Sequence, residues 1–233
     1  MFVSYDAGET WDNISSVPTE SSDLQPGGIA DVVIDDSVKL ANGRSATVYV
    51  AVWGRGMYES HDGGVSFKHM NGSPTFPCRM QVLGDKIYIT ATTDNSSHTI
   101  PGGFFCYENG KFTDLSPDDG RKWYMAFMIN RENPDMMIIC KASYVDSCDI
   151  LRTYDGGKTW ENLGAVLNPT GICQDPIDPN GIWWPHGKGI YYIPNMHEKR
   201  FSHIDADYNV EELVVTGVTS VPSKEAPVLL SDV

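Results

Sequence analysis

One eight-residue phrase occurs three times in this chain of 233 residues. The copies are SYDAGETW at Ser4–Trp11, SHDGGVSF at Ser60–Phe67 and TYDGGKTW at Thr153–Trp160. All three fit the pattern Ser/Thr-x-Asp-x-Gly-x-Thr/Ser-aromatic. Such a specific recurrence indicates a fold assembled from repeated structural units, so the phrase constrains the architecture before any other feature does.

Each copy predicts a tight turn between two β-strands. The carboxylate of the shared aspartate can accept hydrogen bonds from backbone N–H groups of the turn. The glycine two positions later allows a positive φ, and the Thr or Ser hydroxyl after it can add a second local hydrogen bond. The aromatic residue is expected to begin the next strand and to bury its ring between neighbouring sheets.

The phrases resemble Asp-boxes, also called BNR repeats. These occur in the β-propellers of sialidases, of glycoside hydrolase family 74 (tandem propellers that cleave xyloglucan), of sortilin-type receptors and of a photosystem assembly factor. The resemblance implies an all-β fold, a β-propeller of four-stranded antiparallel blades with Asp-box turns. In these families the box is a structural corner away from the active site, so Asp6, Asp62 and Asp155 are predicted to be structural rather than catalytic.

The chain length accommodates about five blades, since a four-stranded blade takes roughly 40–50 residues. We therefore expect a single β-propeller domain, or a propeller fragment, over residues 1–233. The interval from Asp62 to Asp155 is 93 residues, against 56 from Asp6 to Asp62, which predicts an intervening blade with an ordinary Asn-Gly turn at Glu108–Lys111. The predicted blades are approximately 1–15 (partial), 26–70, 77–115, 122–163, 170–205 and 210–233 (partial).

Strand patterns support these boundaries. First strands are expected at Gly28–Asp35, Cys78–Leu83 and Trp123–Ile129, with Asp36–Ala46 as a connection. Further strands are expected at Val210–Val215 and Ala226–Leu230.

Two closures of the propeller remain open: Ala226–Val233 can begin the sheet that Phe2–Ser15 finishes, giving a five-bladed ring, or the chain is part of a larger propeller. The first phrase lies so close to Met1 that a start within a blade is favoured.

Charge limits the classes of partner. The chain carries 17 basic and 31 acidic residues, a formal net charge of −14. This negative field repels phosphate, so neither nucleic acid nor an anionic membrane surface is an expected partner.

No apolar run reaches transmembrane length, and the first residues lack the features of a signal peptide. The family resemblance implies an extracellular or periplasmic location; the oligomeric state stays open.

Cysteine and histidine usage predicts neither a metal nor a cofactor. The five cysteines have spacings that match neither a zinc site nor a small disulfide framework, and they are interpreted as buried free thiols: Cys78, Cys106, Cys140, Cys148 and Cys173. The six histidines form no cluster with ligand spacing. No cofactor is expected.

Ligand contacts are expected on the face opposite the repeated turns. In a four-stranded blade the Asp-box joins strands three and four, so the turns between strands two and three lie on the other face. Aromatic rings there can serve as platforms for sugar rings, and basic side chains can donate to hydroxyls or carboxylates. The predicted substrate-binding residues are Trp53, Arg55, Trp123, Tyr124, Trp183, His186 and Lys188. The competing interpretation is that the aromatic rings pack between blades and the Gly-basic-Gly turns are simple hairpins.

Glycoside hydrolysis generally needs two carboxyl groups across one cleft. Asp31 lies on a predicted inner strand beside an apolar run, where burial can raise its pKa for general-acid duty. Asp146, in a loop, is the second catalytic candidate; Asp118 and Asp119 lie in another loop. None of these residues matches a catalytic sequence pattern of family 74, and no sialidase pattern is found.

The leading hypothesis is a carbohydrate-active propeller, a glycoside hydrolase that acts on neutral plant-type polysaccharide such as xyloglucan. An oligo- or polysaccharide is therefore the expected partner. The alternative is a non-catalytic propeller that binds a glycan or a protein, or assists assembly. A sialidase ranks lower, because the acidic chain disfavours an anionic sialoside.

Overall fold

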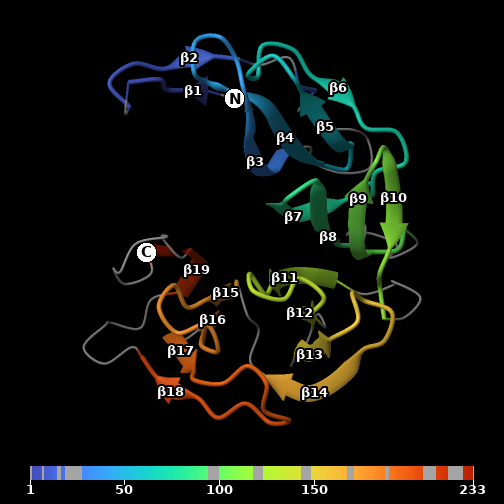
Figure 1. Cartoon of the computed structure of the whole chain (residues 1–233), viewed down its shortest axis with the longest axis vertical. Coiled ribbons are helices and arrows are strands. Elements are labelled where there is room, and N and C mark those ends of the chain that lie inside the picture. Colours follow the sequence, from blue (N-terminus) through green and yellow to red (C-terminus); the bar gives the residue numbers. More distant parts are fainter. Residues whose placement is uncertain are drawn as a thin grey trace. The chain divides into compact units, whose positions relative to one another are not determined.

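The computed structural model describes residues 2–6, 8–14, 17–18, 28–93, 100–117, 123–142, 148–166, 171–186, 189–206, 214–219 and 228–232. The chain divides into two compact units, Met1–Asp114 and Leu115–Val233. All regular structure in the described residues is β-strand (Figure 1). None of the described residues lies in a helix long and apolar enough to cross a membrane.

Unit 1 holds two four-stranded antiparallel meanders and one two-stranded sheet. The short sheet pairs β1 (Phe2–Val3) with β2 (Asp12–Asn13). The first meander comprises β3 (Gly28–Lys39), β4 (Ser45–Trp53), β5 (Gly56–Ser60) and β6 (Lys68–His69). The second comprises β7 (Pro77–Leu83), β8 (Lys86–Ala91), β9 (Gly103–Glu108) and β10 (Lys111–Asp114).

Unit 2 likewise holds two four-stranded antiparallel meanders and one two-stranded sheet. Its first meander comprises β11 (Trp123–Ile129), β12 (Met137–Ala142), β13 (Cys148–Thr153) and β14 (Glu161–Val166). Its second comprises β15 (Cys173–Gln174), β16 (Ile182–His186), β17 (Gly189–Ile193) and β18 (Ile204–Asp205). The short sheet pairs β19 (Val214–Thr219) with β20 (Val228–Asp232).

Most strands lie where the sequence patterns place them, with local differences. β3 continues past Asp35 to Lys39, so the predicted Asp36–Ala46 connection shrinks to the turn Leu40–Arg44. Polar contacts extend the ladder there, because Asp36 accepts from Lys39 and from the Ser45 hydroxyl. β19 begins at Val214, and the part of the expected Val210–Val215 strand before it lies outside the described residues.

The turn between β9 and β10 is the Asn-Gly hairpin that the sequence predicts. Asn109 has a φ of 51° and Gly110 a φ of 79°, and Glu108 pairs with Lys111. Two consecutive positive φ values are typical of the type I′ turn, whose twist matches that of the flanking strands. This meander therefore closes its last hairpin without an aspartate.

The three copies of the phrase form the same hydrogen-bonded turn, here called the Asp corners. In each, the first Ser or Thr hydroxyl donates to Asp Oδ1 and accepts from the glycine N–H. Asp Oδ1 also accepts the backbone N–H of the second Thr or Ser, whose hydroxyl donates to Asp Oδ2. These bonds measure 2.5–3.1 Å, and the glycines have φ values of 87–92°. The predicted staple is confirmed in all three copies.

The aromatic residue of each corner precedes the next strand, as expected, but its burial varies. Phe67 and Trp160 are half-buried, and the Trp160 indole N–H donates to the Leu115 carbonyl at 3.0 Å. Trp11 is 61% exposed and its indole bonds only to the nearby Gly8 carbonyl. The expectation that every one of these rings is buried is therefore wrong for the first corner.

A fourth, divergent corner joins β17 to β18 in unit 2. Asn195 takes the place of the aspartate and its Oδ1 accepts the His197 N–H at 3.0 Å. The next residue, Met196, donates to the Asn180 carbonyl, just as Gly156 of the third corner donates to Asp135. Sequence comparison does not find this corner, because the aspartate, the glycine and the spacing to the aromatic residue have all changed.

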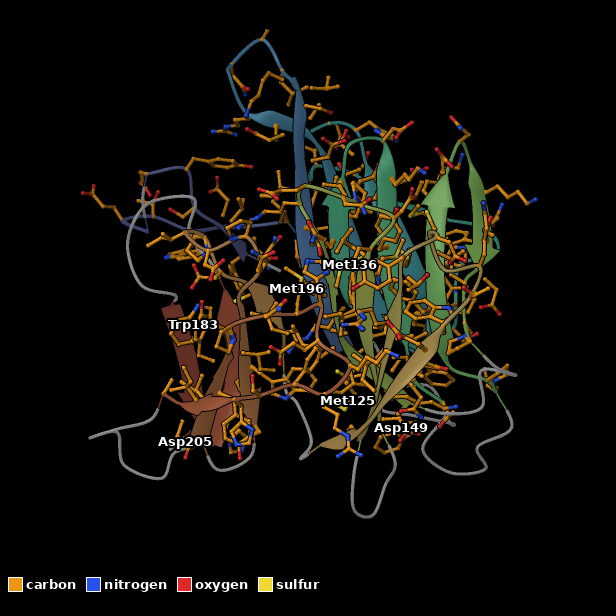
Figure 2. All side chains as sticks on the ribbon, turned by 60° about the horizontal axis from the view of Figure 1, so that its bottom comes forward. Met125, Met136, Asp149, Trp183, Met196 and Asp205 are labelled. Atoms are coloured by element: carbon orange, nitrogen blue, oxygen red, sulfur yellow. The ribbon has the colours of Figure 1, made fainter. Side chains whose placement is uncertain are left out.

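The two meanders of unit 2 share one apolar core. Side chains of β11, β12 and β13 pack against Ile182, Trp184 and Ile193 of the second meander. Met136 and Met196 are completely buried in the same core (Figure 2). In unit 1, an equivalent core joins the β3–β6 and β7–β10 meanders. Each meander thus buries a face that it cannot cover alone.

Arg152 connects the third corner's sheet to the divergent corner. Its side chain is 2% exposed. Nη1 donates to the carbonyls of Met196 and Glu198 at 2.5 and 2.9 Å, and Nε donates to Glu161 Oε1 at 2.6 Å. One guanidinium therefore bonds to three acceptors, two in the divergent corner and one in the sheet of the third corner.

Arg152→Met should destabilise the chain by about 3 kcal/mol, because it leaves the buried Met196 carbonyl, the part-buried Glu198 carbonyl and the Glu161 carboxylate without their charged donor. The free energy of unfolding in urea measures this change. Arg200→Met, at an exposed arginine, is the matched control and should cost less than about 0.5 kcal/mol. Equal stability of the two variants would contradict the proposed connection.

The Asp corners should also respond to acid. Hydrogen bonds from Thr159 and Thr153 lower the pKa of Asp155 from 3.8 to about 2. Because the folded pKa is depressed, the corner's stabilisation is complete above about pH 4 and is lost as the pH falls towards 2. The melting temperature of the wild-type chain should exceed that of Asp155→Asn at neutral pH, and the gap should close over this interval. With Asp85→Asn, in an exposed turn, no such closing gap is expected.

Candidate functional site

In each meander the turn between the second and third strands lies at the end of the sheet opposite the corner. We call these the far ends of the sheets. They comprise the β4–β5 turn at Gly54–Arg55 and the connections β8–β9, β12–β13 and β16–β17. Much of the last three connections, including Asp146 and Lys188, lies outside the described residues.

The far end of the β3–β6 sheet carries Trp53 on a tightly held turn. Trp53 ends β4, is half-buried, and meets Phe76 edge-to-face with ring centroids 5.3 Å apart. Gly56, with a φ of 84°, packs so closely that an added Cβ would lie 2.5 Å from Ser73 Oγ and 2.9 Å from His69 Nε2. His69 also bonds to the Arg55 carbonyl at 3.2 Å. The Gly-Arg-Gly turn is therefore a rigid hairpin that presents the half-buried Arg55 beside Trp53.

Asp31 lies towards the same far end, opposite Ala51. The strand bulges between Ile29 and Asp31, and the carboxylate accepts the Val32 N–H at 2.9 Å and the Met80 N–H of β7 at 2.8 Å. Burial raises the pKa of Asp31 above 3.8, although these bonds and Arg79 oppose the shift. The direction agrees with the sequence argument, while the Met80 bond gives Asp31 a structural role as a link between two sheets.

The far end of the β11–β14 sheet carries Trp123. This residue begins β11 and pairs with Ala142, which precedes the β12–β13 connection. Trp123 is half-buried, so part of its surface is accessible to a ligand. The neighbouring Tyr124 is completely buried, with 0% of its surface exposed. Because its ring has no accessible face in this structure, Tyr124 is not among the proposed ligand-binding residues.

A row of three rings runs across one face of the β15–β18 sheet and begins with His186 at the far end. Tyr191 lies between His186 and His203, with ring centroids 4.1 Å from each. His186 is 3% exposed, whereas His203 is exposed. Sequence reasoning selected His186 but not its two neighbours. The signal is strand alternation: Tyr191 pairs with Trp184 and so shares the face of the sheet on which His186 lies.

Trp183 lies nearer the corner end of β16. It pairs with Tyr192, which in turn pairs with Ile204 of β18. The indole N–H donates to Asp175 Oδ2 at 2.6 Å, and the ring lies 4.9 Å from that of Tyr192. The Tyr192 hydroxyl donates to Asp178, and burial together with the two aspartates raises the pKa of Tyr192 to about 12. These contacts give Trp183 a packing role beside the β15–β16 turn.

Metal chemistry finds no support within the described part of the chain. No group of three or more His, Cys, Asp or Glu side chains there is arranged to hold a metal ion. All five cysteines are free thiols, and burial raises the pKa of Cys140 and of Cys173. Thiols held protonated in this way behave as small apolar side chains.

The meanders and their order along the chain define a class: this is an all-β protein with the four-stranded antiparallel blades of a β-propeller. Proteins similar to it in sequence and in structure include xyloglucanases and enzymes of glycoside hydrolase family 74. The chain is 26% identical to xyloglucanase Xgh74A of Acetivibrio thermocellus over 251 aligned positions, which cover 94% of this chain and 30% of that protein. It thus spans under a third of the length of this curated relative. No family model matches the chain.

Solved structures share the fold. The GH74 xyloglucanase of Xanthomonas campestris superposes with a TM-score of 0.76 at 20% identity, covering 99% of this chain and 39% of that one. YCF48 bound to D1 peptide superposes with a TM-score of 0.62 at 10% identity, covering 97% and 67%. One blade architecture thus occurs in a polysaccharide hydrolase and in a peptide-binding protein, so the fold by itself does not determine the function.

The two kinds of aspartate should titrate differently. The carboxyl group of Asp31 should have its midpoint above 3.8, because burial disfavours the charged form, whereas that of Asp62 should lie near 2, because its corner donates to the carboxylate. Carbon-13 NMR of carboxyl-labelled aspartate measures both in one titration. An Asp31 midpoint below 3.8 would remove the basis for its role as an acid.

Proposed function

We propose that this protein acts on xyloglucan as a glycoside hydrolase. The observation that carries the proposal is the similarity to xyloglucanase Xgh74A, which extends over nearly the whole chain rather than over the corners alone. The likeness of fold to the Xanthomonas campestris enzyme supports it. We further propose that the Asp corners are the Asp-boxes of this architecture, and that the protein works outside the cytoplasm, where such a polysaccharide is met.

The far ends of the sheets are the proposed binding surface. Trp53 and Trp123 each lie at a far end, and the ring row at Tyr191 extends from a third far end towards the middle of its sheet; each has a partly accessible aromatic surface. Aromatic faces pack well against the C–H faces of sugar rings, while a neighbouring polar group fixes orientation. Arg55 and His203 supply such groups beside two of these rings.

Asp31 is the proposed general acid. Its pKa is already raised by burial, which suits a group that must carry a proton to the leaving oxygen. A second carboxylate is needed across the cleft, about 5–9.5 Å away. Asp146 stays the proposed second carboxylate, and it lies outside the described residues.

Release of reducing ends from xyloglucan by the purified chain tests this proposal. The wild-type chain should cleave xyloglucan and leave sialyllactose intact. Asp31→Asn should lower kcat by at least about 100-fold, because general acid catalysis contributes that much or more. Asp85→Asn, in the exposed β7–β8 turn, is the matched control and should retain full activity.

Folding of each variant is checked separately by circular dichroism, since Asp31 also bonds to Met80. Unchanged hydrolysis in a folded Asp31→Asn variant would remove Asp31 from the mechanism. Xyloglucan binding without any hydrolysis by the wild-type chain would favour the non-catalytic binding propeller instead.

A further inference from the structure

A pocket of about 440 Å³ lies on the β11–β14 sheet, and all the residues that line it belong to unit 2. Strand alternation places it on the face away from the shared core: Cys140 and Ile150 pack into that core, whereas Lys141 and Leu151 face the pocket. The lining residues are Ser116, Pro117, Lys141, Asp149, Leu151, Lys158, Thr159, Trp160 and Asn162. Its Lys141–Asp149 pair lies towards the far end of this sheet, but on the opposite face from Trp123, which pairs with Ala142.

One wall of the pocket is aromatic and fixed. Trp160 is half-buried, and its indole N–H donates to the Leu115 carbonyl at 3.0 Å, which sets the orientation of the ring. The third Asp corner holds the backbone just before it, because Thr159 is bonded to Asp155 through both its N–H and its hydroxyl. The ring is therefore positioned before any ligand arrives.

The other walls offer both donors and acceptors. Lys141 and Asp149 are direct cross-strand partners, so an ammonium and a carboxylate lie side by side on β12 and β13 (Figure 2 labels Asp149). Asn162 Oδ1 accepts the Gly164 N–H at 2.7 Å, which leaves its amide NH₂ as the side chain's donor. The exposed Lys158 adds a second ammonium group.

This chemistry suits a neutral sugar. Each sugar hydroxyl both donates and accepts a hydrogen bond, and so uses an adjacent ammonium and carboxylate together. A pyranose ring also has a C–H face for the Trp160 indole. The charge of Lys141 is offset by Asp149, so the pocket is not a strong anion site. Its volume lies within the range of about 300–1,000 Å³ found for small-molecule sites.

We propose that this pocket is a second carbohydrate-binding site, which holds one or two neutral pyranose units beside the third Asp corner. It lies on the opposite face of the β11–β14 sheet from Trp123, and the proposal does not rest on hydrolysis, because the lining residues alone define the ligand class. A polysaccharide bound at both sites gains affinity through the higher effective concentration of its second segment.

The test follows the Trp160 indole N–H signal by NMR during titration of the full chain with cellotetraose, a neutral probe. Trp160→Phe assigns the signal. We expect the wild-type signal to shift on titration and Lys141→Met to weaken binding by about tenfold, the usual effect of losing one charged hydrogen bond. Lys86→Met, at an exposed lysine paired with Glu108 in unit 1, is the matched control and should leave the binding unchanged.

Three results would overturn the proposal: no shift of the Trp160 signal, equal affinity of the wild-type chain and a folded Lys141→Met variant, or a shift with a galacturonate oligosaccharide but not with cellotetraose. Xyloglucan hydrolysis by the Lys86→Met control, measured in parallel, should match that of the wild-type chain. A chain that binds cellotetraose here but hydrolyses nothing would refute the proposed hydrolase alone.

Discussion

Each of the three Asp corners depends on a single aspartate carboxylate. In all three corners that carboxylate accepts hydrogen bonds from two hydroxyls and one backbone N–H, and Asp62 accepts a fourth from the Val65 N–H. These donors hold the pKa of Asp62 at about 2, so the charge persists over any ordinary pH. Because the corner fixes the place where the third strand reverses into the fourth, it also fixes which end of the sheet is left for ligand contacts. We propose that its effect on function is positional rather than chemical.

The second meander of unit 2 shows how the fold tolerates the loss of that carboxylate. The Asn195 side chain accepts one local hydrogen bond, from the His197 N–H. The Met196 and Glu198 carbonyls of this divergent corner accept from Arg152, which belongs to the preceding sheet. A local interaction has been replaced by one between two sheets, supported by the shared apolar core. The corner geometry is thus maintained while its sequence signature is lost.

The sequence predicts the strands and corners well because both follow from local rules: alternation, positive-φ glycines and side-chain acceptors. It does not predict burial, which depends on neighbouring sheets. Trp11 is exposed where a buried ring was expected, and Tyr124 is buried at a predicted binding position. The Trp183 indole donates its N–H to Asp175, and the two residues come together only through the pairing of β15 with β16. Tyr191 and His203 come next to His186 only through strand pairing, and the pocket beside Trp160 gathers residues from three strands and two loops.

The central claim is that ligand contacts lie at the far ends of the sheets, opposite the Asp corners. A crystal structure of the chain with a xyloglucan oligosaccharide tests this most directly. We expect sugar rings against Trp53 or Trp123, with Asp31 on the same side of its sheet as the bound chain. A sugar found only beside the Asp corners, with Trp53 and Trp123 uncontacted, would contradict the account.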